Sequence, residues 1–191
     1  MTRTTVTPMA GFVIRGSCIS EMSAVKPLSY SFPPIVGIKP RVLILGSMPG
    51  VASLEAQQYY AHPRNAFWPI MAELVALNTQ WSYQTRCQHL VDHGIAVWDV
   101  LKACYRPGSL DQHIDPASIE ANDFQDFFEQ HPTLEAVFFN GSKSEQLFKR
   151  QVLPTLSAHR PMIKLPSTSP AHAALSVSEK LAAWRVVRDY C

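Results

Sequence analysis

The chain has 191 residues, of which 47% are hydrophobic and 17% are charged, so it is a globular chain of one-domain length and not a disordered one. Lys and Arg number 17 against 15 Asp and Glu, and the formal net charge of +2 gives no bulk electrostatic case for a nucleic acid or a membrane. Any such partner must be recognised at a local site.

The first residues of the chain show no sustained period of 2 or 3.6 residues, and a second methionine follows at Met22. We expect residues 1–25 to be an N-terminal extension, either disordered or upstream of the true start. We expect residues 1–21 to be dispensable and one domain to cover 26–191. From Lys26 to Pro40, repeated prolines favour extended backbone and predict a strap across the surface.

Four short apolar runs each have the pattern of a strand that is buried on both faces: residues 42–47, 94–101, 134–142 and 162–168. Helical patterns lie between these runs. The alternation predicts a three-layer α/β/α sandwich with a central four-stranded parallel sheet. In such a sheet ligands bind beyond the carboxyl ends of the strands, which points to the loops after Ser47, Leu101, Asn140 and Leu165.

Capping residues predict where several helices begin. Ser82 is expected to cap a helix that runs to His93, and Asp115 with Pro116 opens a helical region of one or two pieces ending near Gln130. The segments 142–145 and 176–179 both have the Ser-x-Ser-Glu pattern of a capping box. An apolar pattern that opens at Phe67 and Trp68 predicts one more helix packed into the core.

The first of the four loops, residues 46–68, carries the richest set of polar and aromatic side chains. Its GSMPG turn brings backbone close to a ligand. With QQYYAHPRNAFW in the same loop, FFNG at 138–141 and LPSTSPAHA at 165–173, the sequence resembles the hypoxanthine-DNA glycosylase family of the uracil-DNA glycosylase superfamily. The resemblance covers about residues 31–190.

This resemblance implies a monofunctional DNA glycosylase of base excision repair. Such an enzyme hydrolyses the N-glycosidic bond of a deaminated base, here hypoxanthine, after flipping it out of double- or single-stranded DNA. The only lysine in the motif loops is Lys164, within the last predicted strand, which leaves no plausible Schiff-base lysine. The alternatives are a uracil-preferring mismatch glycosylase and a catalytically silent DNA- or nucleotide-binding module.

The resemblance also implies two catalytic candidates. Asn65, the asparagine of HPRN, carries the essential role in the family, and an amide can position water or polarise the base; its other reading is a helix cap. His62 either donates a hydrogen bond to the leaving base or is a structural residue. Met48 and Leu165 replace an Asp or Asn and a His that assist catalysis elsewhere in the superfamily, which is the ground for the silent alternative.

Base-binding candidates are Tyr60, Asn140, Gly46 and Ser47. Tyr60 resembles the aromatic that stacks on the flipped base, or else it is a core aromatic. Asn140 offers an acceptor and a donor side by side, which fits the N1–H and O6 edge of hypoxanthine; otherwise it caps a turn. The depth of the base pocket at Tyr60 and Ser47 would then determine whether a purine or a pyrimidine fits.

Phosphate-binding candidates are the hydroxyls of Ser167, Thr168 and Ser169 and the guanidinium of Arg64, which is alternatively a surface ion-pair partner. The four cysteines are dispersed and form no C-x-x-C pair: they are Cys18, Cys87, Cys104 and Cys191. We therefore expect no metal and no cofactor. We also expect a reduced, cytoplasmic protein. No apolar run reaches the length of a membrane span, and we expect no membrane partner and a monomer.

Overall fold

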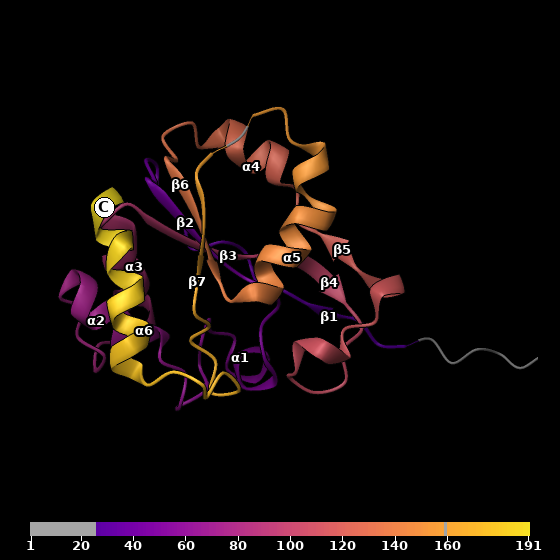
Figure 1. Cartoon of the computed structure of the whole chain (residues 1–191), viewed down its shortest axis with the longest axis horizontal. Helices are drawn as coiled ribbons and strands as arrows, with labels where there is room; N and C mark the ends of the chain where they lie inside the picture. Colours follow the sequence, from indigo (N-terminus) through magenta and orange to yellow (C-terminus); the bar gives the residue numbers. More distant parts are fainter. Residues whose placement is uncertain (1–25, 159) are drawn as a thin grey trace, which may run out of the picture.

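The computed structural model describes residues 26–158 and 160–191, and Figure 1 shows their arrangement. The expectations for residues 1–25 lie outside the described residues. The central sheet has four parallel strands in the order β3-β2-β6-β7. They are β2 (Val42–Gly46), β3 (Ile95–Asp99), β6 (Ala136–Asn140) and β7 (Met162–Leu165). The predicted fold class is therefore confirmed.

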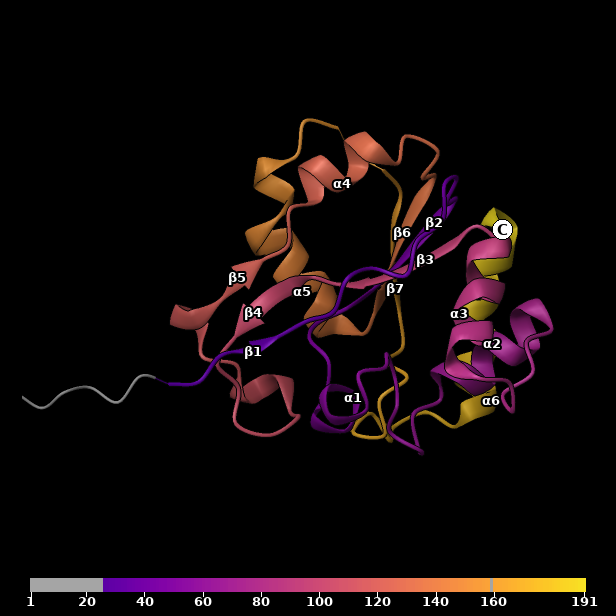
Figure 2. The ribbon, with the colours of Figure 1, turned by 180° about the vertical axis from the view of Figure 1, so that it is seen from behind.

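Helices cover both faces of this sheet, as Figures 1 and 2 show. Alternate residues of β2 point to opposite faces: Ile44 packs in the cluster that contains Trp184, and Leu45 packs in the cluster that contains Phe148. On the first face lie α2 (Phe67–Val75), α3 (Tyr83–Asp92) and α6 (Val177–Trp184). On the second lie α4 (Phe124–Gln130) and α5 (Ser142–Gln151).

A second, three-stranded antiparallel sheet was not predicted. It consists of β1 (Ser29–Tyr30), β4 (Leu101–Cys104) and β5 (Glu120–Ala121), in the order β1-β4-β5. The apolar run at 94–101 predicts one strand, but the parallel strand ends at Asp99 and the chain enters the second sheet at Leu101. The proline-rich strap begins with β1 and so places Ser31 beside the end of β3.

Several helix ends agree with the sequence. Ser82 caps α3, and Ser176 with Glu179 forms a complete capping box on α6. The capping box expected at Ser142 is wrong, because Ser142 lies inside α5 and the helix follows Gly141, whose φ of 104° suits glycine. Asp115 caps only a 3-10 turn, Pro116–Ser118, and α4 is a separate helix capped by Asp123.

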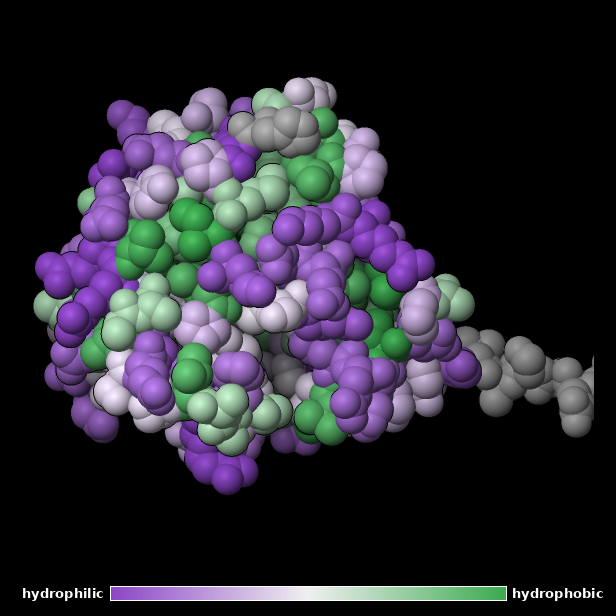
Figure 3. Space-filling view, viewed as in Figure 1, coloured by the Kyte–Doolittle hydropathy of each residue, from purple (hydrophilic) through white to green (hydrophobic). Residues whose placement is uncertain are grey.

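The remaining elements are short. They are α1 (Val51–Ala56) and the 3-10 turns Asp111–His113, Leu153–Thr155 and Arg185–Tyr190. Within the described ranges, no helix has the length and apolar character needed to span a membrane. The face in Figure 3 mixes hydrophilic residues with small hydrophobic patches.

Candidate active site

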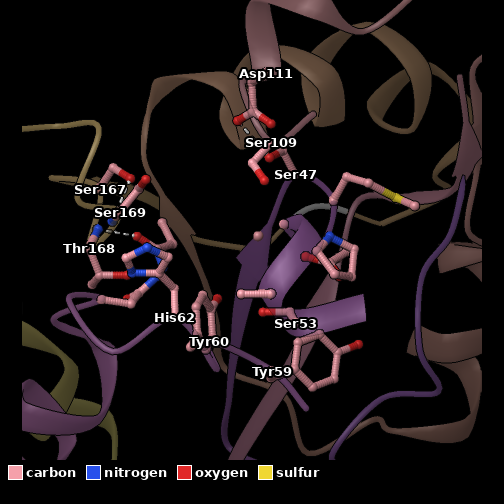
Figure 4. A pocket seen from close by; sticks show the side chains of 18 of the residues that line it. Ser47, Ser53, Tyr59, Tyr60, His62, Ser109, Asp111, Ser167, Thr168 and Ser169 are labelled. Carbon is pink, nitrogen blue, oxygen red and sulfur yellow. Dashed lines mark hydrogen bonds between the residues drawn. The ribbon is translucent and has the colours of Figure 1, made fainter. Parts of the chain in front are cut away.

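A cavity of about 160 Å³ lies at the carboxyl ends of the parallel strands, where the alternation of strands and helices predicted a site. Cavities of about 150 Å³ hold one small aromatic ring. Figure 4 shows the loop of Ser167, Thr168 and Ser169 on one side, and Ser47, Ser109 and Asp111 on another. All predicted catalytic and base-binding residues line this cavity, and so do the three predicted phosphate-binding hydroxyl residues. The set is Gly46, Ser47, Tyr60, His62, Asn65, Asn140, Ser167, Thr168 and Ser169. Arg64 does not line the cavity.

The carboxyl ends of β2 and β3 approach closely in this cavity. A Cβ atom added to Gly46 would clash with Asp99 Oδ1, so only glycine leaves room for that carboxyl group. The side chain of Ser47, the next residue, donates a hydrogen bond to Asp111 Oδ2 at 2.7 Å. Gly46 thus contributes to the site because its missing side chain leaves room for the Asp99 carboxyl group.

Asp99 is a cavity residue that the sequence analysis missed. It is 3% exposed, and Ser31 Oγ donates to its Oδ2 at 2.6 Å. Burial raises the pKa of this carboxyl group to about 7; the Ser31 hydrogen bond and Arg106 lower it, and Asp111 raises it. Its signal in the sequence was a single carboxylate at the end of an apolar strand, in GIAVWDVL.

Tyr60 lines the cavity and also packs on the core. Its backbone is in the left-handed region, with φ of 55°, and its ring stacks on that of Phe67 with centroids 3.9 Å apart. The hydroxyl group is buried without a hydrogen-bond partner among the described residues, and burial raises its pKa. Both readings of Tyr60, the platform and the core aromatic, are compatible with this position.

Asn65 and His62 are each held through one polar atom. The Asn65 side-chain carbonyl accepts the backbone N–H of Phe67 at 3.0 Å, which caps the start of α2 and leaves the Nδ2 amide free of described partners. His62 Nδ1 accepts the backbone N–H of Arg64 at 3.1 Å. In the neutral ring the proton therefore lies on Nε2, so each residue retains a donor for a ligand.

Asn140 joins the end of β6 to the last loop. Its amide donates to Thr168 Oγ1 at 2.9 Å and accepts the Thr168 N–H at 2.8 Å. Thr168 is 1% exposed, and its carbonyl accepts the backbone N–H of Ala66 at 3.0 Å. The Thr168 side chain, a predicted phosphate contact, is thus buried and bonded to Asn140, and the Asn140 amide keeps one N–H and one lone pair beyond these two bonds.

A loop after β4 holds the first motif in place, and the sequence analysis missed it too. The side chain of Arg106 is buried, and its guanidinium donates hydrogen bonds to the carbonyls of Met48 and Pro49 and to Asp111. Met48 itself packs in the hydrophobic cluster that contains Leu45 and Phe148, so its side chain does not supply a polar group.

Helix α6 supports the last loop from beneath. Trp184 Nε1 donates to the carbonyl of Pro166 at 2.9 Å, and Lys180 Nζ donates to that of His172 at 2.8 Å. Leu165 is 4% exposed and belongs to the core. Ser167 and Ser169 remain partly exposed at the cavity, and Arg64 is exposed.

A second cavity, of about 310 Å³, shares Tyr60, His62 and Asn65 with the first. Arg86 of α3 lines it, with the guanidinium 4.3 Å from the centre of the Trp68 ring. The Arg86 Nε atom is buried and has no hydrogen-bond partner among the described residues, and burial lowers the pKa of the guanidinium. A partly buried guanidinium, which contacts aromatic rings and has no acidic partner among the described residues, therefore lies in the cavity next to the first one.

Over the described parts of the chain, no three His, Cys, Asp or Glu side chains are grouped so that they could hold a metal ion. Cys87, Cys104 and Cys191 are free thiols.

Comparisons with known proteins place the chain in a family. The profile of the uracil DNA glycosylase superfamily matches residues 33–188. Two curated relatives are named hypoxanthine DNA glycosylase. The one from Methanosarcina barkeri is 40% identical over 114 residues, which cover 59% of this chain and 71% of the relative. The one from Methanosarcina acetivorans is 35% identical over 135 residues, which cover 66% and 84%.

A solved structure gives the same result. The solution NMR structure of a Methanosarcina acetivorans protein, provisionally described as a uracil DNA glycosylase, superposes with a TM-score of 0.67 at 32% identity and covers 84% of this chain and 99% of that one. The chain belongs to the uracil DNA glycosylase superfamily. The resemblance read from the motifs is confirmed.

The raised pKa of Asp99 predicts how stability depends on pH. Because folding raises this pKa from 3.8 to about 7, the folded state binds the proton more tightly, and the resulting stability is present at low pH and lost as pH rises to about 7. At 1.36 kcal/mol per pKa unit the loss is roughly 4 kcal/mol.

Urea unfolding between pH 4.5 and 8.5 measures this effect. Asp99→Asn should lose this contribution to the pH dependence, whereas Asp189→Asn, at an exposed position, should behave like the wild type. Equal pH dependence in wild type and Asp99→Asn would contradict the assignment.

Proposed function

We propose that this member of the uracil DNA glycosylase superfamily is a monofunctional DNA glycosylase, which hydrolyses the N-glycosidic bond of deaminated bases flipped out of DNA and prefers hypoxanthine. The observation that carries the proposal is the convergence of Tyr60, His62 and Asn65 on one base-sized cavity. The names of the two curated relatives support hypoxanthine as the base.

The cavity offers what a flipped base requires. Extruding a nucleotide from a duplex costs a few kcal/mol, least for a mismatched or damaged base. Stacking on an aromatic ring returns about 1–3 kcal/mol per base. Tyr60 supplies such a ring, and its stacking on Phe67 fixes the ring before the base arrives.

Bond cleavage passes through an oxocarbenium-like sugar, while negative charge grows on the departing base. Donors placed before the reaction stabilise that charge. The Asn65 amide and His62 Nε2–H are the two donors left open by the hydrogen bonds described above. Asn65 orients water or the base, and His62 donates to the leaving group.

A Schiff-base mechanism finds no support in this cavity. None of its described lining residues is a lysine, and Lys164 lies on β7 with its side chain half exposed and directed toward Glu145. Water is then the nucleophile, and no metal or cofactor takes part in the reaction.

DNA is the partner, recognised through phosphates around the cavity. The proposed phosphate contacts are Ser167 and Ser169 at the cavity and the exposed Arg64, and Arg86, which has no acidic partner among the described residues, is a further one. The cavity is complete within one chain, and we propose that the protein acts as a monomer. Repair of DNA in the cytoplasm fits the dispersed, free thiols of the described cysteines.

Uracil is the second candidate base, because the solved relative is provisionally described as a uracil DNA glycosylase. Single-turnover assays with duplexes that contain deoxyinosine or deoxyuridine, followed by alkali cleavage, compare the two. We expect excision of both, faster for deoxyinosine. Faster excision of uracil would reverse the preference, and excision of neither by a folded protein that binds DNA would indicate a silent binding module.

Asn65 has a capping role and a proposed catalytic role, and two variants separate them. Asn65→Asp keeps the oxygen that accepts the Phe67 N–H but replaces the amide donor, so the melting temperature should change little. Its single-turnover rate should fall at least about 100-fold, as expected for loss of one oriented catalytic hydrogen bond.

Asn65→Ala is the comparison, since it removes both groups and should also lose about 1 kcal/mol of stability. A normal excision rate in Asn65→Asp would show that Asn65 only caps α2.

Arg86 should act on DNA affinity and not on bond cleavage. Arg86→Gln should weaken binding of undamaged and deoxyinosine-containing DNA alike and lower the salt slope by about 1, because one phosphate contact is lost. The single-turnover rate at saturating enzyme should stay unchanged. The control is Arg150→Gln, in the last turn of α5, and equal binding by the two variants would remove Arg86 from the interface.

A further inference from the structure

The floor of the base cavity contains a carboxyl group to which the proposed chemistry gives no role. Asp99 ends β3, and its Oδ2 accepts the Ser31 hydroxyl. Its Oδ1 accepts no hydrogen bond from a described side chain and occupies the space that a side chain at Gly46 would take. One oxygen of the carboxyl group is thus anchored, and the other faces the cavity.

The surroundings of Asp99 favour its protonated form. Two neutral phenols, Tyr59 and Tyr60, lie near it, and their pKa values are raised by burial and by the carboxylate itself. Among charged groups, Asp111 raises the pKa of Asp99 and Arg106 lowers it, while burial is the largest influence. Near neutral pH, protonated and ionised forms of the carboxyl group therefore coexist.

The position of Asp99 determines which part of a base it can reach. A flipped nucleotide enters with its sugar at the cavity mouth, so a group that is 3% exposed at the floor faces the edge farthest from the sugar. In hypoxanthine O6 lies at that far edge, and N7 lies next to O6 on the adjoining edge of the five-membered ring, so a carboxyl group that approaches from the O6 side reaches N7. N7 is the most basic ring nitrogen of the purine, and its protonation weakens the bond between N9 and the sugar.

We propose that Asp99 is the general acid of the glycosylase, with the Oδ1 proton passing to N7 of hypoxanthine as the bond between C1′ and N9 breaks. This inference rests on the proposed function. The electron pair of the broken bond stays on the base, which leaves as neutral hypoxanthine protonated at N7. Water adds to C1′, and its proton restores the Asp99 carboxyl group, so one water is consumed per base released.

A purely structural role for Asp99 predicts something different. If Asp99 only anchored the strap through Ser31, removing either partner would lower stability and would leave the pH profile of excision in place. As a general acid, Asp99 must be protonated to act, so excision must slow as pH rises through about 7.

Single-turnover excision of deoxyinosine between pH 5 and 9 tests this with two variants. Asp99→Asn should lower the rate at pH 6 by at least about 100-fold and should remove the fall above pH 7. Ser31→Ala removes a hydrogen bond that stabilises the carboxylate, so it should keep the rate at pH 6 and move the fall to higher pH. An unmoved pH profile in Ser31→Ala would contradict the proposal even if Asp99→Asn fails to fold.

A modified substrate locates the proton. In 7-deaza-2′-deoxyinosine a carbon replaces N7, so the wild type should excise it slowly and Asp99→Asn should cause little further loss. The same fold-loss from Asp99→Asn on both substrates would place the proton elsewhere. Wild-type protein that excises neither deoxyinosine nor deoxyuridine would refute the proposed function, whereas rapid deoxyinosine excision by Asp99→Asn would refute only this inference.

Discussion

The close approach of two neighbouring parallel strands at their carboxyl ends is the constraint on which the site depends. Gly46 ends β2 without a side chain, and the space that it leaves is filled by the carboxyl group of Asp99 from β3. A charged carboxylate is costly at a site that is 3% exposed, so this packing raises the pKa of Asp99. The fold therefore creates a titratable group at the floor of the base cavity.

The walls of the cavity are set by a continuous chain of hydrogen bonds. The Asn140 amide holds Thr168 from two sides, and Thr168 in turn accepts the backbone N–H of Ala66, next to Asn65. The segment with Asn65 and the serine-rich loop are thus linked through Thr168. The Asn140 amide uses one N–H and one lone pair for Thr168 and keeps a second of each, so it is open to a base together with Asp99, His62 and Asn65, which line the same cavity.

The sequence predicts the central sheet and most cavity residues because buried parallel strands have continuous apolar runs and the motif loops follow their carboxyl ends. It does not predict the second sheet, whose strands β1 and β5 have two residues each. Asp99 escaped notice because burial and a neighbouring glycine give it its chemistry, and both arise from tertiary packing. The same holds for Thr168, whose exposure no local pattern reveals.

The most direct measurement of the central claim is an NMR titration of the Asp99 carboxyl carbon, assigned with Asp99→Asn, in the free protein and with added hypoxanthine. The account predicts a midpoint near 7 in the free protein, which shifts when hypoxanthine occupies the cavity and contacts the carboxyl group. A midpoint below about 5, close to that of an exposed aspartate and unmoved by hypoxanthine, would contradict it.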